Sequence, residues 1–298
     1  MTTKVLIFTD LDGSLLDHFS YRFDTAKPLL ALLKTVKIPV IPVTSKTRAE
    51  LSVLRQQLAS EDPFVVENGA AIFIPVDYFS LPPSGCSIVD GFYCYSFSKP
   101  REHWLTLLAA QATEFAGEFE TFTSLGVEGI KVCTGLSTEA ASRANNREFS
   151  EPVKWLGSES RKSLFVTTLR RAGATVLQGG RFLHVTGGCN KGKALQWLYQ
   201  QYRDSISHEV GKSEFLTIAA GDSDNDVDML QVADCPVLIR SPVQEPPVFE
   251  HLNVYRTKQT GPDGWVEGVS WFLGASERPQ EMNSIEYLQK KLRSNVYG

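Results

Sequence analysis

The chain has 298 residues, of which 42% are hydrophobic and 21% are charged, a profile typical of soluble globular proteins. The formal net charge is only −4 at pH 7, and no basic cluster is present, so we expect neither nucleic-acid nor membrane binding. Five scattered cysteines without a C-x-x-C pair argue against a disulfide framework and a structural zinc site. With no apolar stretch long enough to span a bilayer, we expect a cytoplasmic protein.

The first sixty residues alternate between strand and helix patterns. Apolar strands are predicted at residues 4–10 and 38–43, and helices at residues 25–37 and 47–59. This alternation favours right-handed βαβ units and therefore a parallel sheet.

The middle third of the chain has a different pattern. It combines an aromatic-rich strand with probable helices and a hairpin around Gln178-Gly179-Gly180. The expected strands cover residues 91–97, 174–177 and 181–185, and the helices residues 102–116, 138–145 and 159–171.

From Lys191 the strand and helix alternation resumes. We expect a helix to residue 202, strands at 215–220 and 236–239, and a helix at 225–233 between them. The predicted fold is α/β: a doubly wound parallel sheet core built from residues 1–84 and 187–298, with an inserted α+β cap domain over residues 85–186.

Two carboxylates, Asp10 and Asp12, follow the first predicted strand directly, and Gly13 lets the chain turn away. In an open α/β sheet, ligands bind beyond the carboxyl ends of the strands. A carboxylate pair at that position can hold a divalent cation against an anion. The pair alone is weak evidence, because Asp-x-Asp also holds metal in some glycosyltransferases.

A second acidic cluster occupies residues 221–230, after another predicted buried strand. An EF-hand is excluded, because Val227 and Ala233 stand where its loop requires glycine and glutamate. We expect Asp222 and Asp226 to face the same crevice as the first pair. Four carboxylates there would repel one another without a cation, and an all-oxygen ligand set favours Mg²⁺ over Zn²⁺.

Cations and hydroxyls occur near both predicted strand ends. Residues 187–194 nearly match a phosphate-binding P-loop, but Ala194 lacks the hydroxyl that would ligate Mg²⁺. Lys191 is therefore expected to pair with a phosphoryl group or with the aspartates. Thr44 begins a run of hydroxyls and cations at a helix N-terminus, which predicts an anion-binding site.

These four motifs, in this order, resemble those of the haloacid dehalogenase (HAD) superfamily of phosphatases. Residues 10–14 are similar to its first motif, Thr44 to the second, Lys191 to the third and residues 221–226 to the fourth. The inserted module resembles the C2B cap of the type IIB (Cof-like) branch, whose members mostly dephosphorylate sugar phosphates.

The resemblance implies a role for each motif residue. Asp10 would be the nucleophile that forms an aspartyl-phosphate, and Asp12 would act as acid and then as base. Thr44 and Lys191 would hold the phosphoryl oxygens. The implied Mg²⁺ ligands are Asp10, the Asp12 backbone carbonyl and Asp222. Asp226 would either bind the metal directly or contact the residues that bind it.

Five further stretches resemble the mannosyl-3-phosphoglycerate phosphatase subgroup: residues 44–50, 67–72, 147–152, 180–184 and 261–265. The implied reaction converts mannosyl-3-phosphoglycerate, or its glucosyl counterpart, to the glycosylglycerate and phosphate. The expected partner is therefore a small phosphorylated sugar substrate. The protein itself is expected to be a monomer or a homodimer. Expected substrate contacts are Ser45, Lys46, Asn68, Arg147, Ser150, Gly187 and Asn225.

Other functions remain open at this point. Another type IIB phosphatase acting on sucrose phosphate or hexose phosphates is the nearest rival, followed by a phosphomannomutase-like phosphotransferase. A non-catalytic sugar-phosphate sensor would not need the complete charged set of the four motifs. Arg147 could also be an ordinary solvated surface arginine.

Overall fold

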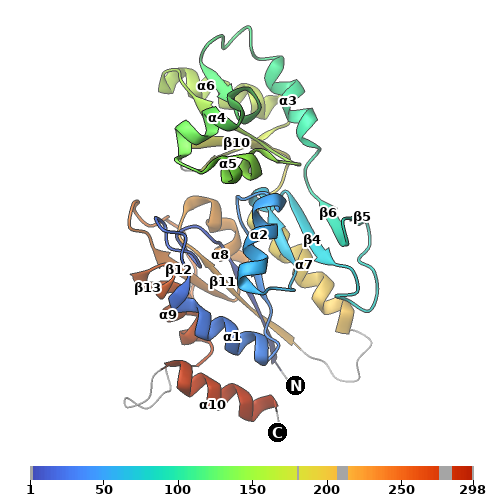
Figure 1. Ribbon diagram of the computed structural model, residues 1–298, viewed down its shortest axis with the longest axis vertical. Coiled ribbons are helices and arrows are strands. Elements are labelled where there is room, and N and C mark those ends of the chain that lie inside the picture. The colour runs from blue at the N-terminus through green and yellow to red at the C-terminus, as the bar shows by residue number, and fades with distance from the viewer. Residues whose placement is uncertain (1–2, 180, 207–213, 275–283, 297–298) are drawn as a thin grey trace.

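The computed structural model describes residues 3–179, 181–206, 214–274 and 284–296. It contains a core built around a parallel sheet and a smaller cap, which lies above the core in Figure 1. None of the helices in these ranges is long and apolar enough to cross a membrane.

The central sheet has five parallel strands, as the alternating pattern predicted. Its order, from one edge to the other, is β13 (Tyr255–Thr260), β12 (Cys235–Arg240), β11 (Glu214–Gly221), β1 (Thr3–Thr9) and β2 (Val40–Pro42). Strands from the two ends of the chain therefore lie side by side, with β1 paired to β11 along its whole length.

Helices cover both faces of this sheet because successive strand side chains point to opposite faces. Ile7 packs with apolar residues of α1 (Lys27–Thr35), α2 (Arg48–Leu58) and α9 (Asp263–Phe272). Its neighbours Leu6 and Phe8 pack with α7 (Lys191–Ile206) and α8 (Val227–Val232) on the other face. The doubly wound prediction is confirmed.

A second sheet extends the core beyond β2. It is antiparallel in the order β3 (Phe64–Val66), β4 (Ala71–Pro75), β6 (Phe92–Ser96) and β5 (Ser87–Val89), and the pair Val43–Val65 links it to the end of β2. Its side chains join both apolar clusters of the core.

This pairing bears on the expected domain boundary at residues 84 and 85. That boundary would separate β4 from β5 and β6, although β6 is hydrogen-bonded to β4 over five residue pairs. We propose that the cap begins near Ser98 and ends near Thr186, close to the second expected boundary.

The cap is a four-stranded antiparallel sheet with helices on both faces. The strand order is β7 (Phe119–Thr121), β8 (Glu151–Trp155), β10 (Phe182–Thr186) and β9 (Thr175–Gly179). Helices α3 (Arg101–Ala109) and α6 (Glu159–Arg171) pack on one face, and α4 (Phe122–Thr134) and α5 (Thr138–Asn145) on the other. The two strands of the predicted hairpin are present as β9 and β10, which pair antiparallel. Gly180 lies outside the described residues.

Several local predictions differ from the structure. Helix α3 ends at Ala109, not at residue 116, and the chain continues in turns toward Gly117, which has φ +73°. Helix α4 was not predicted, because Gly126 and Gly129 lower its helix propensity and Gly126 interrupts it with φ +61°. The C-terminal elements β13, α9 and α10 (Ser284–Val296) were also not predicted.

Candidate active site

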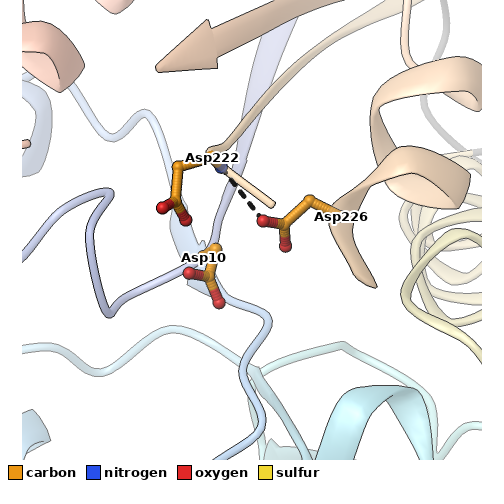
Figure 2. A group of neighbouring side chains, drawn as sticks. All are labelled: Asp10, Asp222 and Asp226. Atoms are coloured by element: carbon orange, nitrogen blue, oxygen red, sulfur yellow. Dashed lines mark hydrogen bonds between the residues drawn. The ribbon is translucent and has the colours of Figure 1, made fainter. Parts of the chain in front are cut away.

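The parallel pairing of β1 with β11 brings two motifs together at the carboxyl edge of the sheet. Thr9 is in register with Ala220, and the Asp10 amide donates to the Ala220 carbonyl at 2.8 Å. Asp10 and Asp222 therefore leave adjacent strands side by side. Together with Asp226 they form a buried group in which one carboxylate oxygen of each residue lies within 4.8 Å of those of the other two (Figure 2).

Lys191, the first residue of α7, reaches into this group. Its ammonium lies 2.6 Å from Asp10 Oδ1 and 2.5 Å from Asp226 Oδ1, and its side chain is fully buried. Burial alone would lower the pKa of Lys191, but the two carboxylates raise it above its ordinary value. The lysine therefore carries its charge inside the site.

The negative charge of the three carboxylates is only partly balanced. Burial raises the pKa of Asp10 to about 7; Lys191 opposes this, and Asp226 and Asp12 add to it. Burial likewise raises the pKa of Asp222 to about 8, with repulsion from Asp226 and Asp10 in the same direction. A divalent cation would relieve this repulsion, and oxygen ligands of this kind fit Mg²⁺.

Asp226 differs from the other two aspartates, because both of its oxygens already have partners. Oδ1 accepts from Lys191, while Oδ2 accepts from the Asp222 amide at 3.0 Å and from the amide and hydroxyl of Ser223, each at 3.1 Å. Gly221 leaves room for this side chain, since a Cβ there would lie 2.5 Å from the Asp226 Cβ. Asp226 therefore contacts both Lys191 and the backbone of the loop at residues 222–223.

Gly13 has a similar steric role in the first motif. Its φ of +81° lies in the left-handed region, and a Cβ at this position would lie 2.6 Å from Asp222 Oδ2. The glycine thus lets the first motif turn directly beside the fourth.

Asp12 faces the site from the first motif and pairs with Lys46. The Lys46 ammonium lies 2.7 Å from Asp12 Oδ2. Burial alone would lower the pKa of Lys46, but Asp12 and Glu50 raise it. Within the described residues Asp12 Oδ1 is buried without a hydrogen-bond partner, although the side chain as a whole is 34% exposed. A buried oxygen without a partner is unusual and marks a place where a ligand can bind.

Thr44 lies at the carboxyl end of β2, as expected. Its side chain is buried, and its Oγ1 accepts from the Lys46 amide at 3.2 Å. Helix α2 begins just beyond, where Thr47 and Glu50 cap each other's backbone amides. The amino end of α2 therefore faces the site, in a position suited to an anion.

Other expected contact residues lie around this centre. Asn225 Nδ2 donates to Asn68 Oδ1 at 3.0 Å, which joins the fourth motif to the turn after β3. Gly187 lies where the chain returns from the cap, and its amide donates to Ser98 Oγ at 3.0 Å.

Arg147 and Ser150 come from the cap and reach the core. Arg147 is 7% exposed and donates to the Ser45 carbonyl at 3.0 Å, so the alternative of a solvated surface arginine is wrong. Ser150 donates to Glu67 Oε2 at 2.5 Å. No role was expected for Glu67, although its position directly after the apolar strand at residues 64–66 is a signal that could have indicated one.

Comparisons with known proteins agree with this geometry. No protein-family model matches the chain. A glucosyl-3-phosphoglycerate/mannosyl-3-phosphoglycerate phosphatase of Methanococcoides burtonii is 35% identical over 272 residues, covering 91% of this chain and 98% of the relative. The chain belongs to this phosphatase family. A protein of the same name from Persephonella marina is 32% identical over 280 residues, covering 92% of this chain and 99% of that relative.

Solved structures agree on the fold. The phosphatase BT1666 of the HAD superfamily, from Bacteroides thetaiotaomicron, superposes with a TM-score of 0.59 at 18% identity, covering 91% of this chain and 95% of its own. The HAD subclass IIB sugar phosphatase BT4131 has a TM-score of 0.52 at 19% identity, covering 80% and 87%. These structures confirm the expected fold, and membership in the phosphatase family makes the protein a phosphoric monoester hydrolase.

Proposed function

We propose that the protein hydrolyses mannosyl-3-phosphoglycerate or glucosyl-3-phosphoglycerate to the glycosylglycerate and phosphate. The observation that carries this proposal is the buried contact of Lys191 with Asp10 beside Asp222, at the sheet edge that faces the cap. The names of the two relatives supply the substrate class. The five cysteines, none of them in a disulfide, support the expected cytoplasmic location.

The residues present fit a magnesium ion. Asp10 and Asp222 offer hard oxygen ligands, and Asp12, through its backbone carbonyl, would complete the protein's share. Asp226, whose oxygens are engaged by Lys191 and the loop amides, would act through Asp222. A magnesium ion held there supplies positive charge that offsets the repulsion between the Asp10 carboxylate and the phosphate of the substrate.

In the first half-reaction, Asp10 attacks phosphorus and forms a bond from its carboxylate oxygen as the bond to the glycerate oxygen breaks. Asp12 donates its proton to the departing alkoxide. Lys191 and Thr44 hold the phosphoryl oxygens, where the buried ammonium stabilises the charge that develops. The product of this step is an aspartyl-phosphate at Asp10.

In the second half-reaction, Asp12 takes a proton from a water molecule that attacks the same phosphorus. The bond between phosphorus and the Asp10 oxygen breaks, and phosphate leaves. Asp10 is restored as a carboxylate and Asp12 as an acid. The lysine contact keeps Asp10 in place throughout.

The glycosyl and glycerate parts would be held between core and cap. Lys46 and Arg147 are the cations that we assign to the glycerate carboxylate, with Ser45, Asn68 and Ser150 nearby as polar contacts. Arg147 reaches this position only because the cap lies against the core, as its bond to the Ser45 carbonyl shows. Substrate choice is therefore expected to depend on the cap.

The test is Asp10→Asn, assayed by initial-rate phosphate release with Mg²⁺. The substrates are mannosyl-3-phosphoglycerate, glucosyl-3-phosphoglycerate and sucrose 6-phosphate in parallel. We expect turnover of the first two to be abolished while the circular dichroism spectrum is retained, and Asp224→Asn, at an exposed aspartate, to keep full activity. Retained turnover in Asp10→Asn would exclude the nucleophile, and comparable wild-type rates on all three esters would exclude the narrow substrate class.

A further inference from the structure

Glu67 is a buried carboxylate of the core whose hydrogen-bond and ion-pair partners, among the residues that the structure describes, all come from the cap. Its side chain is 1% exposed, in the turn between β3 and β4. It accepts from the Glu148 amide at 2.8 Å, the Phe149 amide at 3.3 Å and the Ser150 hydroxyl at 2.5 Å, and Arg147 Nε lies 3.4 Å away. Glu67 takes no part in the proposed reaction steps.

The turn that carries Glu67 has an unusual backbone. Glu67 and Asn68 have φ of +51° and +60°, a region that residues other than glycine seldom adopt, and Gly69 follows with φ +90°. Strain of this kind persists where surrounding contacts hold it. Here the Glu67 amide donates to the Lys46 carbonyl at 3.0 Å and the Asn68 amide to the Thr44 carbonyl at 2.8 Å.

The same turn contacts the third and fourth motifs. Asn68 accepts from Asn225 of the fourth motif, and Gly69 packs so closely against the Asn190 carbonyl, next to Lys191, that a Cβ would collide with it. Residues 67–69 thus connect the second, third and fourth motifs with one segment of the cap.

We propose that Glu67 is a positioning residue that fixes the closed cap on the core and sets Arg147 and Ser150 in place for the substrate. The part that concerns substrate rests on the proposed function; the contact between cap and core does not. Glu67 acts through these two residues and through the amides of Glu148 and Phe149, and does not itself touch the reacting atoms.

The other contacts between cap and core are less suited to this role. The Arg48 guanidinium pairs with Glu148 at 2.7 Å, but both side chains are more than 20% exposed. The Thr47 hydroxyl donates to the Arg143 carbonyl at 2.8 Å, a bond between uncharged groups. Charge-assisted bonds to a fully buried carboxylate are stronger than exposed ion pairs. In the proposed role, these bonds would break when the cap opens to admit substrate and re-form when it closes.

The test compares Glu67→Gln with Glu151→Gln. Glu151 is equally buried, but it bonds within the cap, to Arg101 and to the Thr123 amide, so it controls for loss of a buried carboxylate as such. Hydrogen exchange of the peptide covering residues 147–150 reports on the amides of Glu148 and Phe149, which donate hydrogen bonds to Glu67. We expect this exchange to rise at least tenfold in Glu67→Gln and to stay within twofold in Glu151→Gln.

Kinetics supply the second readout. In Glu67→Gln we expect kcat/KM for the glycosyl-phosphoglycerate to fall at least tenfold, chiefly through KM. Hydrolysis of p-nitrophenyl phosphate, which is too small to need the cap, should stay within twofold. Equal losses on both substrates would mean a general structural role and would overturn the proposal.

Ser150→Ala removes a single cap donor and tests the same contact if Glu67→Gln does not fold. In Ser150→Ala, hydrogen exchange at residues 147–150 and KM for the glycosyl-phosphoglycerate should both rise, by smaller factors than in Glu67→Gln. Unchanged exchange at residues 147–150 in whichever variants fold would overturn the proposal. Faster exchange in a protein that shows no activity on either glycosyl-phosphoglycerate would support Glu67 as the cap contact while refuting the proposed function.

Discussion

The Lys46 ammonium donates to Asp12 Oδ2 at 2.7 Å, while Asp12 Oδ1 is buried and, as far as the described chain extends, has no hydrogen-bond partner. One oxygen is thus held by Lys46, and the other is buried without a partner among the described residues. This arrangement suits a group that must give a proton to a leaving oxygen and later take one from water.

Asp12→Ala should separate these two tasks. With the glycosyl-phosphoglycerate, whose alkoxide needs a proton, we expect kcat to fall by about 10²–10⁴. With p-nitrophenyl phosphate the leaving group needs no proton, so one equivalent of nitrophenol should appear rapidly before a slow steady state. Rapid-mixing absorbance measures this burst; losses of the same size on both substrates, without a burst, would rule out the acid and base assignment.

Lys191→Met should destabilise the metal-free protein. It leaves the buried carboxylates of Asp10 and Asp226 without their cation, and breaking a buried ion pair costs about 3–5 kcal/mol of unfolding free energy. Urea denaturation with a chelator present measures this loss. The double variant Lys191→Met/Asp226→Asn should recover part of the stability, and an unchanged midpoint in the single variant would contradict the expectation.

Gly13→Ala should weaken magnesium binding more than folding. The added Cβ would lie 2.6 Å from Asp222 Oδ2 and displace that carboxylate. We expect the Mg²⁺ concentration for half-maximal activity to rise at least tenfold. Gly91→Ala is the matched control, because Gly91 has the same φ of +81° but nothing within 4 Å of the added Cβ; equal effects in both variants would show that backbone strain alone is responsible.

His184 should make stability depend on pH. Burial lowers the pKa of His184 to about 3, with a further contribution from Arg147. Below an unfolded-state pKa near 6.5, the unfolded chain binds the extra proton and the folded chain does not, so the contribution to stability is present above pH 6.5 and is lost as pH falls.

The difference between wild type and His184→Gln isolates this contribution, because the raised pKa values of Asp10 and Asp222 act in the opposite direction in both proteins. Between pH 7 and pH 5, wild type should lose about 1–2 kcal/mol of unfolding free energy relative to the variant. Chemical denaturation at both pH values measures it. Parallel pH profiles would show that His184 titrates normally in the folded protein.

The core sheet and the site residues of the four motifs could be predicted because each is indicated by a short stretch of sequence. The apolar run at residues 4–10 ends in Asp10, and the run at residues 215–220 is followed two residues later by Asp222. Parallel strands place such ends at one edge of the sheet. The pairing of β5 and β6 with β4 could not be predicted, because it depends on contacts between segments whose own patterns resemble a loop and a cap strand.

The sequence by itself determined the parallel core and the residues gathered at its edge, since apolar periodicity and strand-end carboxylates are properties of short segments. Only the tertiary structure decided which of those carboxylate oxygens have hydrogen-bond partners and which have none among the described residues. Asp226 is engaged by Lys191 and the loop amides, whereas Asp12 keeps one oxygen unpartnered by any described residue. It also decided that Glu67 bridges to the cap, because burial and hydrogen bonds to distant residues arise only when the two domains meet.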